Sequence, residues 1–214
     1  AGEEAAAAFR EGFEKAGGTV VKELYLPFPN VEFQALLTEI AAQKPDVVFA
    51  FFAGGGAVKF VKDYDAAGLR RTIPLVGSGF LTDGTLEAQG SSAQGLITTL
   101  HYGDNIETPR NNAFRNKYAV AYKLNPDVYA MQGYDAAQML ASGLNAVKGD
   151  DKKRDAMIAA MRKVQIDSPR GKFTLSAQHN PTQDFYVREV RGNYNVVTGV
   201  AVKALADPGR GCRM

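Results

Sequence analysis

Residues 45–79 read PDVVFAFFAGGGAVKFVKDYDAAGLRRTIPLVGSG, and this stretch decides the fold class. Residues 47–52 form a continuous apolar run, which is typical of a parallel strand that is covered on both faces. The glycines at 54–56 then allow a sharp turn, and apolar residues at helical spacing follow them. Residues 73–76 predict a second buried strand, which ends in the Gly-Ser-Gly sequence at 77–79. The order strand, helix, strand predicts an α/β fold with a parallel sheet.

The composition is that of a globular chain with enough apolar residues for a core. Of its 214 residues 45% are hydrophobic and 22% are charged, and the net charge is only +2. This weak charge without a long basic run argues against a nucleic-acid partner. The single cysteine, Cys212, forms neither an internal disulfide nor a metal cluster, and we expect no cofactor. No apolar stretch approaches the ~20 residues that a membrane helix needs.

The rest of the chain continues the alternation at first and then changes character. A helix over residues 1–16 opens the chain, so no strand precedes it, although an α/β layer expects one there. The further expected strands and helices are strands at 19–26 and 95–102 and helices at 30–43, 109–123, 134–147 and 152–164. A hairpin is predicted from residues 185–190 and 196–203 around Gly192 and Asn193. This change from alternation to helices and then to an antiparallel ribbon indicates two lobes.

Signatures of catalysis are weak. The three glycines do not fit G-x-G-x-x-G, no Gly-Lys-Ser/Thr follows them, and the Gly-Ser-Gly sequence is too short for a nucleophile elbow. The only histidines are His101 and His179, and a zinc site needs at least three ligands within reach. A Ser/His/Asp set is a spatial arrangement, so an α/β enzyme of the hydrolase or nucleotide-binding kind remains an alternative.

Binding residues are better indicated, because ligands of open α/β sheets lie at the carboxyl ends of the strands. Of the adjacent Phe51 and Phe52, one faces the core and the other can stack on a ligand, and the sequence does not decide which. Asp135 is expected to favour a helix N-terminus. The predicted ligand-binding residues are Phe52, Ala53, Gly54, Ser78, Gly79, Phe80, Gln94, His101, Tyr102, Met131, Gln132 and Tyr134.

Six blocks in order give the chain a family resemblance. They read PDVVFAFFAGGGAVKFVKDYDAAGL, IPLVGSGFLTD, AQGLITTLHY, NNAFRNKYAVAY, YDAAQML and RGKFTLSAQHNPTQDFYVREV. Together they resemble the periplasmic substrate-binding proteins of ABC importers, in the type I group that includes the branched-chain amino-acid binders. The resemblance covers nearly the whole chain.

The resemblance implies two Rossmann-like lobes, each with a parallel sheet flanked by helices, that close on a ligand. It also implies a longer protein, so the chain is expected to be a C-terminal fragment in which one lobe is incomplete. Residues 1–124 and 184–214 would then be the second lobe, and residues 125–183 the remainder of the first. Expected partners are a small-molecule ligand, the missing N-terminal part of the protein, and a membrane permease with its ATPase. The expected location is the periplasm, with a signal peptide on the missing segment, and no enzymatic activity is expected.

Two departures from the family pattern bear on the ligand. Amino-acid binders of the family commonly carry a carboxylate at the position of Gln94, where it pairs with the ligand's ammonium, and a neutral amide cannot replace that ion pair. Ala53 and Gly54 are also small where those binders have a larger side chain, which leaves space for a ring. The sequence therefore favours an aromatic carboxylate, such as a benzoate or a phenylpropanoid acid. A branched-chain or other amino acid remains the alternative within the family, and a ligand-sensing receptor module is an alternative outside it.

Overall fold

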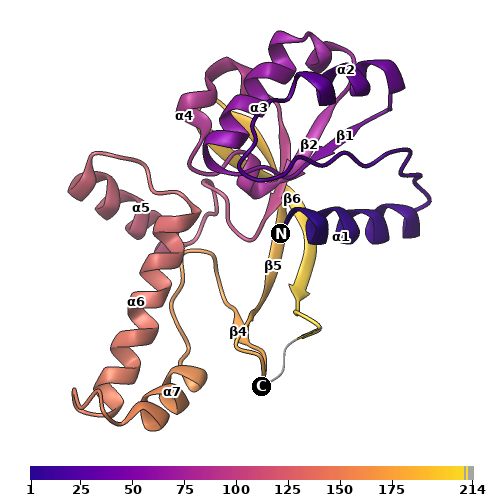
Figure 1. Ribbon diagram of the computed structural model, residues 1–214. Coiled ribbons are helices and arrows are strands. Elements are labelled where there is room, and N and C mark those ends of the chain that lie inside the picture. The colour runs from indigo at the N-terminus through magenta and orange to yellow at the C-terminus, as the bar shows by residue number, and fades with distance from the viewer. Residues whose placement is uncertain (210, 212–214) are drawn as a thin grey trace. The chain divides into compact units, whose positions relative to one another are not determined.

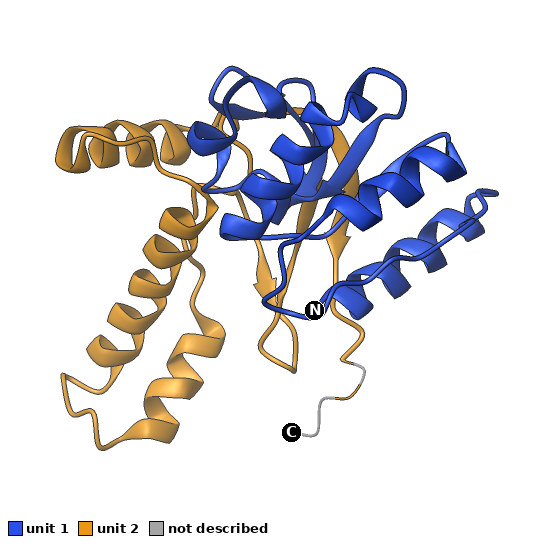
Figure 2. Cartoon of the chain, turned by 45° about the horizontal axis from the view of Figure 1, so that its top comes forward, with its two compact units in different colours: residues 1–100, 187–196 blue, residues 101–186, 197–214 orange. Residues whose placement is uncertain are grey.

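The computed structural model describes residues 1–209 and 211, so Cys212 lies outside the described residues. The chain divides into two compact units, shown in Figure 2. Unit 1 consists of Ala1–Leu100 and Val187–Val196, and unit 2 consists of His101–Tyr186 and Val197–Met214. The predicted lobe boundaries at 124/125 and 183/184 refer to the lobes of a complete protein, and they stay a prediction.

Unit 1 alternates helices with parallel strands, as the sequence predicts (Figure 1). Strand β1 pairs with β2 in parallel, and β2 pairs with β3 in parallel. On the other side of β3 lies β5, where the amide nitrogen of Val190 donates to the carbonyl of Leu96 at 3.0 Å. The elements are α1 (Gly2–Lys15), α2 (Gln34–Gln43), β1 (Val48–Ala50), α3 (Gly54–Ala66), β2 (Leu75–Ser78), α4 (Leu86–Gln89) and β3 (Ile97–Leu100), with short 3-10 helices η1 (Leu69–Arg71), η2 (Gly79–Leu81) and η3 (Gly90–Ala93).

The core of unit 1 is built by the inner faces of α2 and α3 against the strands. Phe33, Leu37 and Ile40 come from the start and one face of α2, and Phe60, Val61 and Tyr64 come from α3. This three-to-four-residue spacing places each set on one side of its helix. The packed core fixes the strands in register, so the ends of β1 and β2 lie next to each other.

Unit 2 consists of helices α5 (Pro109–Tyr122), α6 (Val128–Ala146) and α7 (Arg154–Lys163), strand β4 (Thr174–Leu175), and parts of β5 (Pro181–Arg191) and β6 (Tyr194–Leu205). Strands β4 and β5 are antiparallel, and β6 pairs with β5, which confirms the predicted hairpin. Helices α6 and α7 lie side by side in both ribbon views (Figures 1 and 2).

Three expectations about the elements are wrong. Residues 19–26 form no strand, because no strand of the described chain pairs with their backbone. Helix α2 begins at Gln34, since the side chain of Asn30 accepts from the nearby Glu32 amide at 2.8 Å and makes a turn there. Helix α6 begins at Val128 rather than at 134, because Asp127 caps it by accepting from the Ala130 amide at 2.9 Å.

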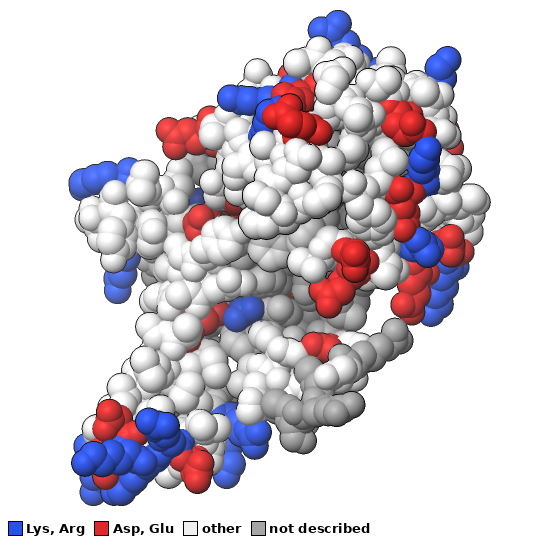
Figure 3. All heavy atoms as spheres, viewed as in Figure 1, with Lys and Arg blue, Asp and Glu red and all other residues white. Residues whose placement is uncertain are grey.

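Charged side chains of both signs are interspersed over the face shown in Figure 3. Over the described residues, no helix combines the length and the apolarity needed to cross a lipid bilayer. The same residues contain no group of three His, Cys, Asp or Glu side chains placed to hold a metal ion.

Candidate functional site

The carboxyl ends of β1 and β2 form one edge of the sheet in unit 1. Their register places Ala50 opposite Gly77, so Phe51 and Ser78 follow as neighbours at this edge. The ring of Phe51 meets the ring of Phe80 edge to face, with the centroids 6.1 Å apart. Both rings are half-buried. A pair of this kind offers a flat apolar surface on which a third ring can pack.

Helix α3 begins at the same edge, directly after β1. Its first three residues are Gly54, Gly55 and Gly56, and no side chain caps its N-terminus. The first turn also contains no acidic residue. Its free backbone N–H groups and the helix dipole therefore favour an anion at this position. Gly54 has a φ of 53°, a left-handed conformation that a residue with a side chain rarely adopts, and a Cβ on Gly55 would meet no atom within 4 Å.

Ser78 and Gly79 play different parts at the end of β2. The Ser78 hydroxyl is buried, and no residue of the described chain hydrogen-bonds to it. Buried hydroxyls normally have a partner, so this one is available to a ligand or a water. Gly79 is instead required by packing, because a Cβ there would lie 2.6 Å from the Leu100 Cβ and 2.7 Å from Arg188 Nη2.

Phe52 lies on the opposite side of the strand from Phe51, as the period of two demands. Its ring packs against Phe33 at 5.0 Å and against Phe60 at 4.7 Å between centroids. Phe52 thus belongs to the edge of the core, while Phe51 is the phenylalanine that reaches Phe80.

Gln94 lies before the start of β3, whereas His101 and Tyr102 follow the end of that strand. The side-chain nitrogen of Gln94 donates to the Gly192 carbonyl at 2.7 Å, and the side-chain oxygen of Gln94 accepts from the Gly192 backbone amide at 2.9 Å. The side chain therefore fastens the turn between β5 and β6. The structure does not bring Gln94 together with the residues at the carboxyl ends of the strands.

In unit 2, His101 and Gln132 lie together. Gln132 Nε2 and His101 Nε2 are 3.2 Å apart, and the His101 ring meets the Phe185 ring edge to face at 5.9 Å. His101 is buried, with 8% of its surface accessible, whereas Gln132 on α6 is exposed. An exposed amide next to an imidazole and an aromatic ring can hydrogen-bond to the polar substituents of an aromatic ligand.

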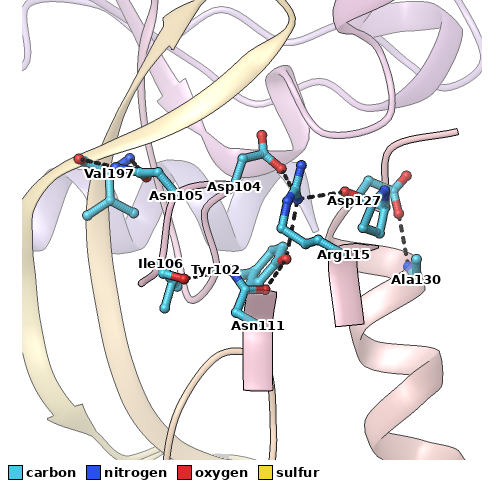
Figure 4. A network of polar contacts seen from close by, with 10 residues as sticks. Tyr102, Asp104, Asn105, Ile106, Asn111, Arg115, Asp127, Ala130 and Val197 are labelled. Atoms are coloured by element: carbon cyan, nitrogen blue, oxygen red, sulfur yellow. Dashed lines mark hydrogen bonds and ion pairs between the residues drawn. The ribbon is translucent and has the colours of Figure 1, made fainter. Parts of the chain in front are cut away.

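Tyr102 is buried in a polar network around Arg115, which Figure 4 shows. The Tyr102 hydroxyl donates to Asn111 Oδ1 at 2.8 Å, and Arg115 Nη1 donates to Asp104 Oδ1 at 2.7 Å and to the Pro126 carbonyl at 3.1 Å. Burial lowers the pKa of Arg115, but the Asp104 charge and the Tyr102 hydrogen bond outweigh it and raise the pKa above its ordinary value. The network joins the segment after β3 to α5 and to the start of α6.

The two remaining predicted residues on α6 have separate surroundings. Met131 is completely buried, and Tyr134 packs against Phe114 with the ring centroids 5.1 Å apart. The expectation for Asp135 is wrong: because α6 begins at Val128, this carboxylate lies inside the helix, where it is buried and pairs with Arg170 at 3.0 Å. Burial raises the pKa of Asp135 despite the hydrogen bond from Ser168 and the charge of Arg170.

Of the residues predicted from the sequence, the structure brings together Ala53, Gly54, Ser78 and Phe80 at one edge of unit 1 and His101 with Gln132 in unit 2. Sequence reasoning left Phe51 undecided and missed Gly55 and Phe185. Knowing which face of β1 packs on the core would have identified Phe51 as the residue that points away from it. Nothing in the sequence around Phe185 indicates its contact with His101.

Comparison with known families decides the class of the protein. A family model described as periplasmic binding protein matches residues 1–195. The chain belongs to the periplasmic binding protein family. The two-lobed type I fold expected from the sequence agrees with this assignment and with the solved structures that the chain resembles.

Members of the family with curated names or solved structures resemble the chain over nearly all of its length. "Leu/Ile/Val-binding protein homolog 6" of Brucella melitensis biotype 1 is 30% identical over 197 residues, which are 88% of this chain and 50% of that protein. A solute-binding protein of an ABC transporter from R. palustris, solved in complex with benzoate, is 50% identical with a TM-score of 0.94. The match covers 99% of this chain and 58% of that one.

A second solved structure is the solute-binding protein of an ABC transporter from Rhodopseudomonas palustris BisB5 in complex with 3,4-dihydroxy benzoic acid. It is 29% identical with a TM-score of 0.88, over 97% of this chain and 58% of that one. The chain therefore spans between half and three fifths of the length of these relatives. The relatives are binding proteins, which is the class expected here in place of an enzyme.

Proposed function

We propose that this chain is the ligand-recognising part of a solute-binding protein that delivers a small aromatic carboxylate to an ABC importer. The single observation that carries the proposal is the edge of unit 1 where the uncapped glycine N-terminus of α3 follows Phe51. The helix start favours the carboxylate, and the Phe51–Phe80 pair favours the ring. A benzoate has these two parts joined by a single bond.

The charge around this edge supports an aromatic acid over an α-amino acid. Neither α3 nor the 3-10 helix η2 has an acidic residue in its first turn, so neither offers a partner for an ammonium group. An unpaired ammonium in a closed site would lose its hydration without compensation. The benzoate complexes among the similar structures support the same choice, while the Leu/Ile/Val-binding relative keeps a branched-chain amino acid as the second candidate.

In this proposal the ligand contacts of unit 1 are Phe51, Ala53, Gly54, Ser78 and Phe80. Phe52 and Gly79 support these contacts through packing. The other predicted residues have separate roles: Gln94 holds the turn between β5 and β6, Tyr102 belongs to the Arg115 network, Met131 is buried, and Tyr134 packs on α5.

The proposed setting follows from the family. The complete protein has two lobes that close on the ligand, and residues 1–124 and 184–214 belong to the second of them. It works in the periplasm, it performs no chemistry on the ligand, and the closed form docks on a membrane permease whose ATPase drives transport.

Titration calorimetry on the protein as its gene encodes it tests the proposal with three matched ligands. Benzoate has the ring and the carboxylate, benzamide has the ring without the charge, and leucine has an ammonium group and no ring. We expect heat from benzoate and at least tenfold weaker binding of benzamide, since the amide has no charge for the α3 N-terminus. Tight leucine binding without benzoate binding would replace the proposed ligand by an amino acid, and the absence of binding to all three would refute the proposed ligand class.

A further inference from the structure

Arg188 on β5 is a charged side chain in the interior of unit 1. Its exposed fraction is 0%, and it is the largest of the fully buried side chains among the described residues. A buried guanidinium loses its hydration and is normally paired and hydrogen-bonded. Arg188 Nη2 lies 2.7 Å from Oδ2 of the buried Asp83, and it also donates to Thr98 Oγ1 on β3 at 3.0 Å. Because the strand order is β2-β3-β5, Arg188 reaches from β5 past β3 to the turn that follows β2.

That turn, residues 79–83, is held around one carbonyl group, that of Gly79. The carbonyl accepts from the backbone amide of Thr82 at 3.1 Å and from that of Asp83 at 3.0 Å. Arg188 Nη2 donates to the same carbonyl at 3.3 Å. A Cβ on Gly79 would lie 2.7 Å from this nitrogen, so the glycine is what allows the guanidinium to reach the turn.

A second buried hydrogen bond fastens the same turn to the neighbouring strand. Thr82 Oγ1 donates to Asn195 Oδ1 on β6 at 2.7 Å, and both residues are buried. The turn is thus attached to both strands of the hairpin. Phe80 lies within the turn, whereas Phe51 follows β1, so the separation of 6.1 Å between their ring centroids depends on where the turn is held.

We propose that Arg188 and Asp83 are positioning residues for the ligand site. Their buried ion pair holds the turn, so that Phe80 presents its ring at a fixed angle to Phe51. This inference rests on the proposed function, because it concerns the surface on which the ring of the ligand packs.

The choice of residues supports a role in positioning. Well-packed apolar side chains of similar volume often stabilise a fold as well as a buried ion pair or better, so stability alone does not call for the pair. Apolar side chains cannot supply the directed hydrogen bond to the Gly79 carbonyl. A fixed aromatic surface favours a flat ring over a puckered one, because contacts between aromatic rings depend on their relative orientation.

Two double variants of the protein as its gene encodes it test this role. Arg188→Met with Asp83→Leu replaces the ion pair by apolar side chains, and Arg170→Met with Asp135→Leu makes the same change in the buried pair of unit 2 as the matched control. Titration calorimetry measures the affinities for benzoate and for cyclohexanecarboxylate, which carry the same charge on a flat and on a puckered ring.

We expect the first double variant to lower the ratio of the benzoate affinity to the cyclohexanecarboxylate affinity by about two- to tenfold, the size of one oriented aromatic contact. Its Tm should stay near that of the unaltered protein, and the control should keep the ratio. A merely structural role would lower Tm and both affinities together. Asp83→Asn keeps Arg188 and the size of the side chain, so it tests the same fall in the ratio should the double variant not fold.

Hydrogen–deuterium exchange without ligand separates this inference from the proposed function. The amides at positions 82 and 83 should exchange at least about tenfold faster in the first double variant than in the control, because the turn is no longer held. Faster exchange would support the hold on the turn even if neither acid bound the unaltered protein, a result that would refute the ligand class alone. Unchanged exchange at both amides would overturn the positioning role. An unchanged ratio in a protein that binds benzoate would also overturn it, and so would an equal fall of the ratio in the control.

Discussion

The N-terminus of α3 gives the sharpest test of the proposed ligand site, through the pair of substitutions Gly55→Asp and Gly55→Asn. The two new side chains have nearly the same shape, and only the aspartate is charged. A Cβ at Gly55 meets no atom within 4 Å, so both variants fit the fold. Gly55 is the second residue of the helix, a position where an acidic side chain stabilises the macrodipole.

The expected magnitude follows from two limits. Two like charges about 4 Å apart repel by about 4 kcal/mol in surroundings with an effective dielectric constant of 20, and by about 1 kcal/mol in bulk water. Gly55 is exposed in unit 1, which favours the lower figure, while a ligand that excludes water moves the value towards the higher one. The aspartate should therefore weaken benzoate binding by between about fivefold and about a thousandfold, since about 1.4 kcal/mol is tenfold. The asparagine should change it by less than about threefold, on the scale of an uncharged surface substitution.

Titration calorimetry with benzoate at neutral pH and low salt measures both variants, and thermal unfolding without ligand supplies the control. The aspartate should leave Tm unchanged or raise it, because it adds about 0.3–1 kcal/mol at a helix N-terminus. Added salt should recover part of the lost binding, since the repulsion is screened. Equal loss in the two variants would mean a steric effect, and unchanged binding in the aspartate variant would refute the placement of the carboxylate at α3.

Three predictions concern stability. Gly79→Ala should lower the free energy of unfolding by about 1–3 kcal/mol in denaturant titrations, because its Cβ would lie 2.6 Å from the Leu100 Cβ, and a glycine-to-alanine change at exposed Gly55 serves as the control. Asp135→Ala should lower the free energy of unfolding by about 3–5 kcal/mol, because it leaves the buried Arg170 without its ion-pair partner. Replacing both residues by apolar ones should recover most of that loss, and a failure to recover it would mean that the pair is not buried together in solution. Burial raises the pKa of Tyr64 to about 12. The stability that the neutral Tyr64 side chain contributes is therefore complete below about pH 10 and is lost as the pH rises to about 12. Tyr64→Phe should not show this loss of stability when both proteins are measured over the same pH range.

The elements that the sequence predicted well depend on local pattern. The parallel β1–β2 pair, the helix at 109–122 and the hairpin of β5 and β6 each follow from spacing, turn residues and breakers within a short window. Residues 19–26 also have a local pattern that predicts a strand, and still they form none. A strand needs a neighbour for its backbone, and no pattern within those eight residues says whether that neighbour is present.

The site residues were harder to predict because their roles depend on distant contacts. Gln94 was predicted near the ligand from the family resemblance, yet its amide hydrogen-bonds to Gly192, 98 residues away. Asp135 pairs with Arg170, 35 residues away, and nothing in the sequence between them signals the contact. His101 and Tyr102 are adjacent, but one contacts the exposed Gln132 while the other is locked into the Arg115 network.

The adjacent phenylalanines show how the core decides the site. The sequence requires that one of Phe51 and Phe52 faces inward, because neighbouring strand residues point to opposite sides. What selects Phe52 is the aromatic pocket formed by Phe33 before α2 and Phe60 on α3. Once Phe52 occupies that pocket, Phe51 must point the other way, where it meets Phe80 beside the glycines of α3. The surface offered to an aromatic ring is thus set by packing on the opposite face of the same strand, so core substitutions around Phe52 should alter ligand affinity without touching the ligand.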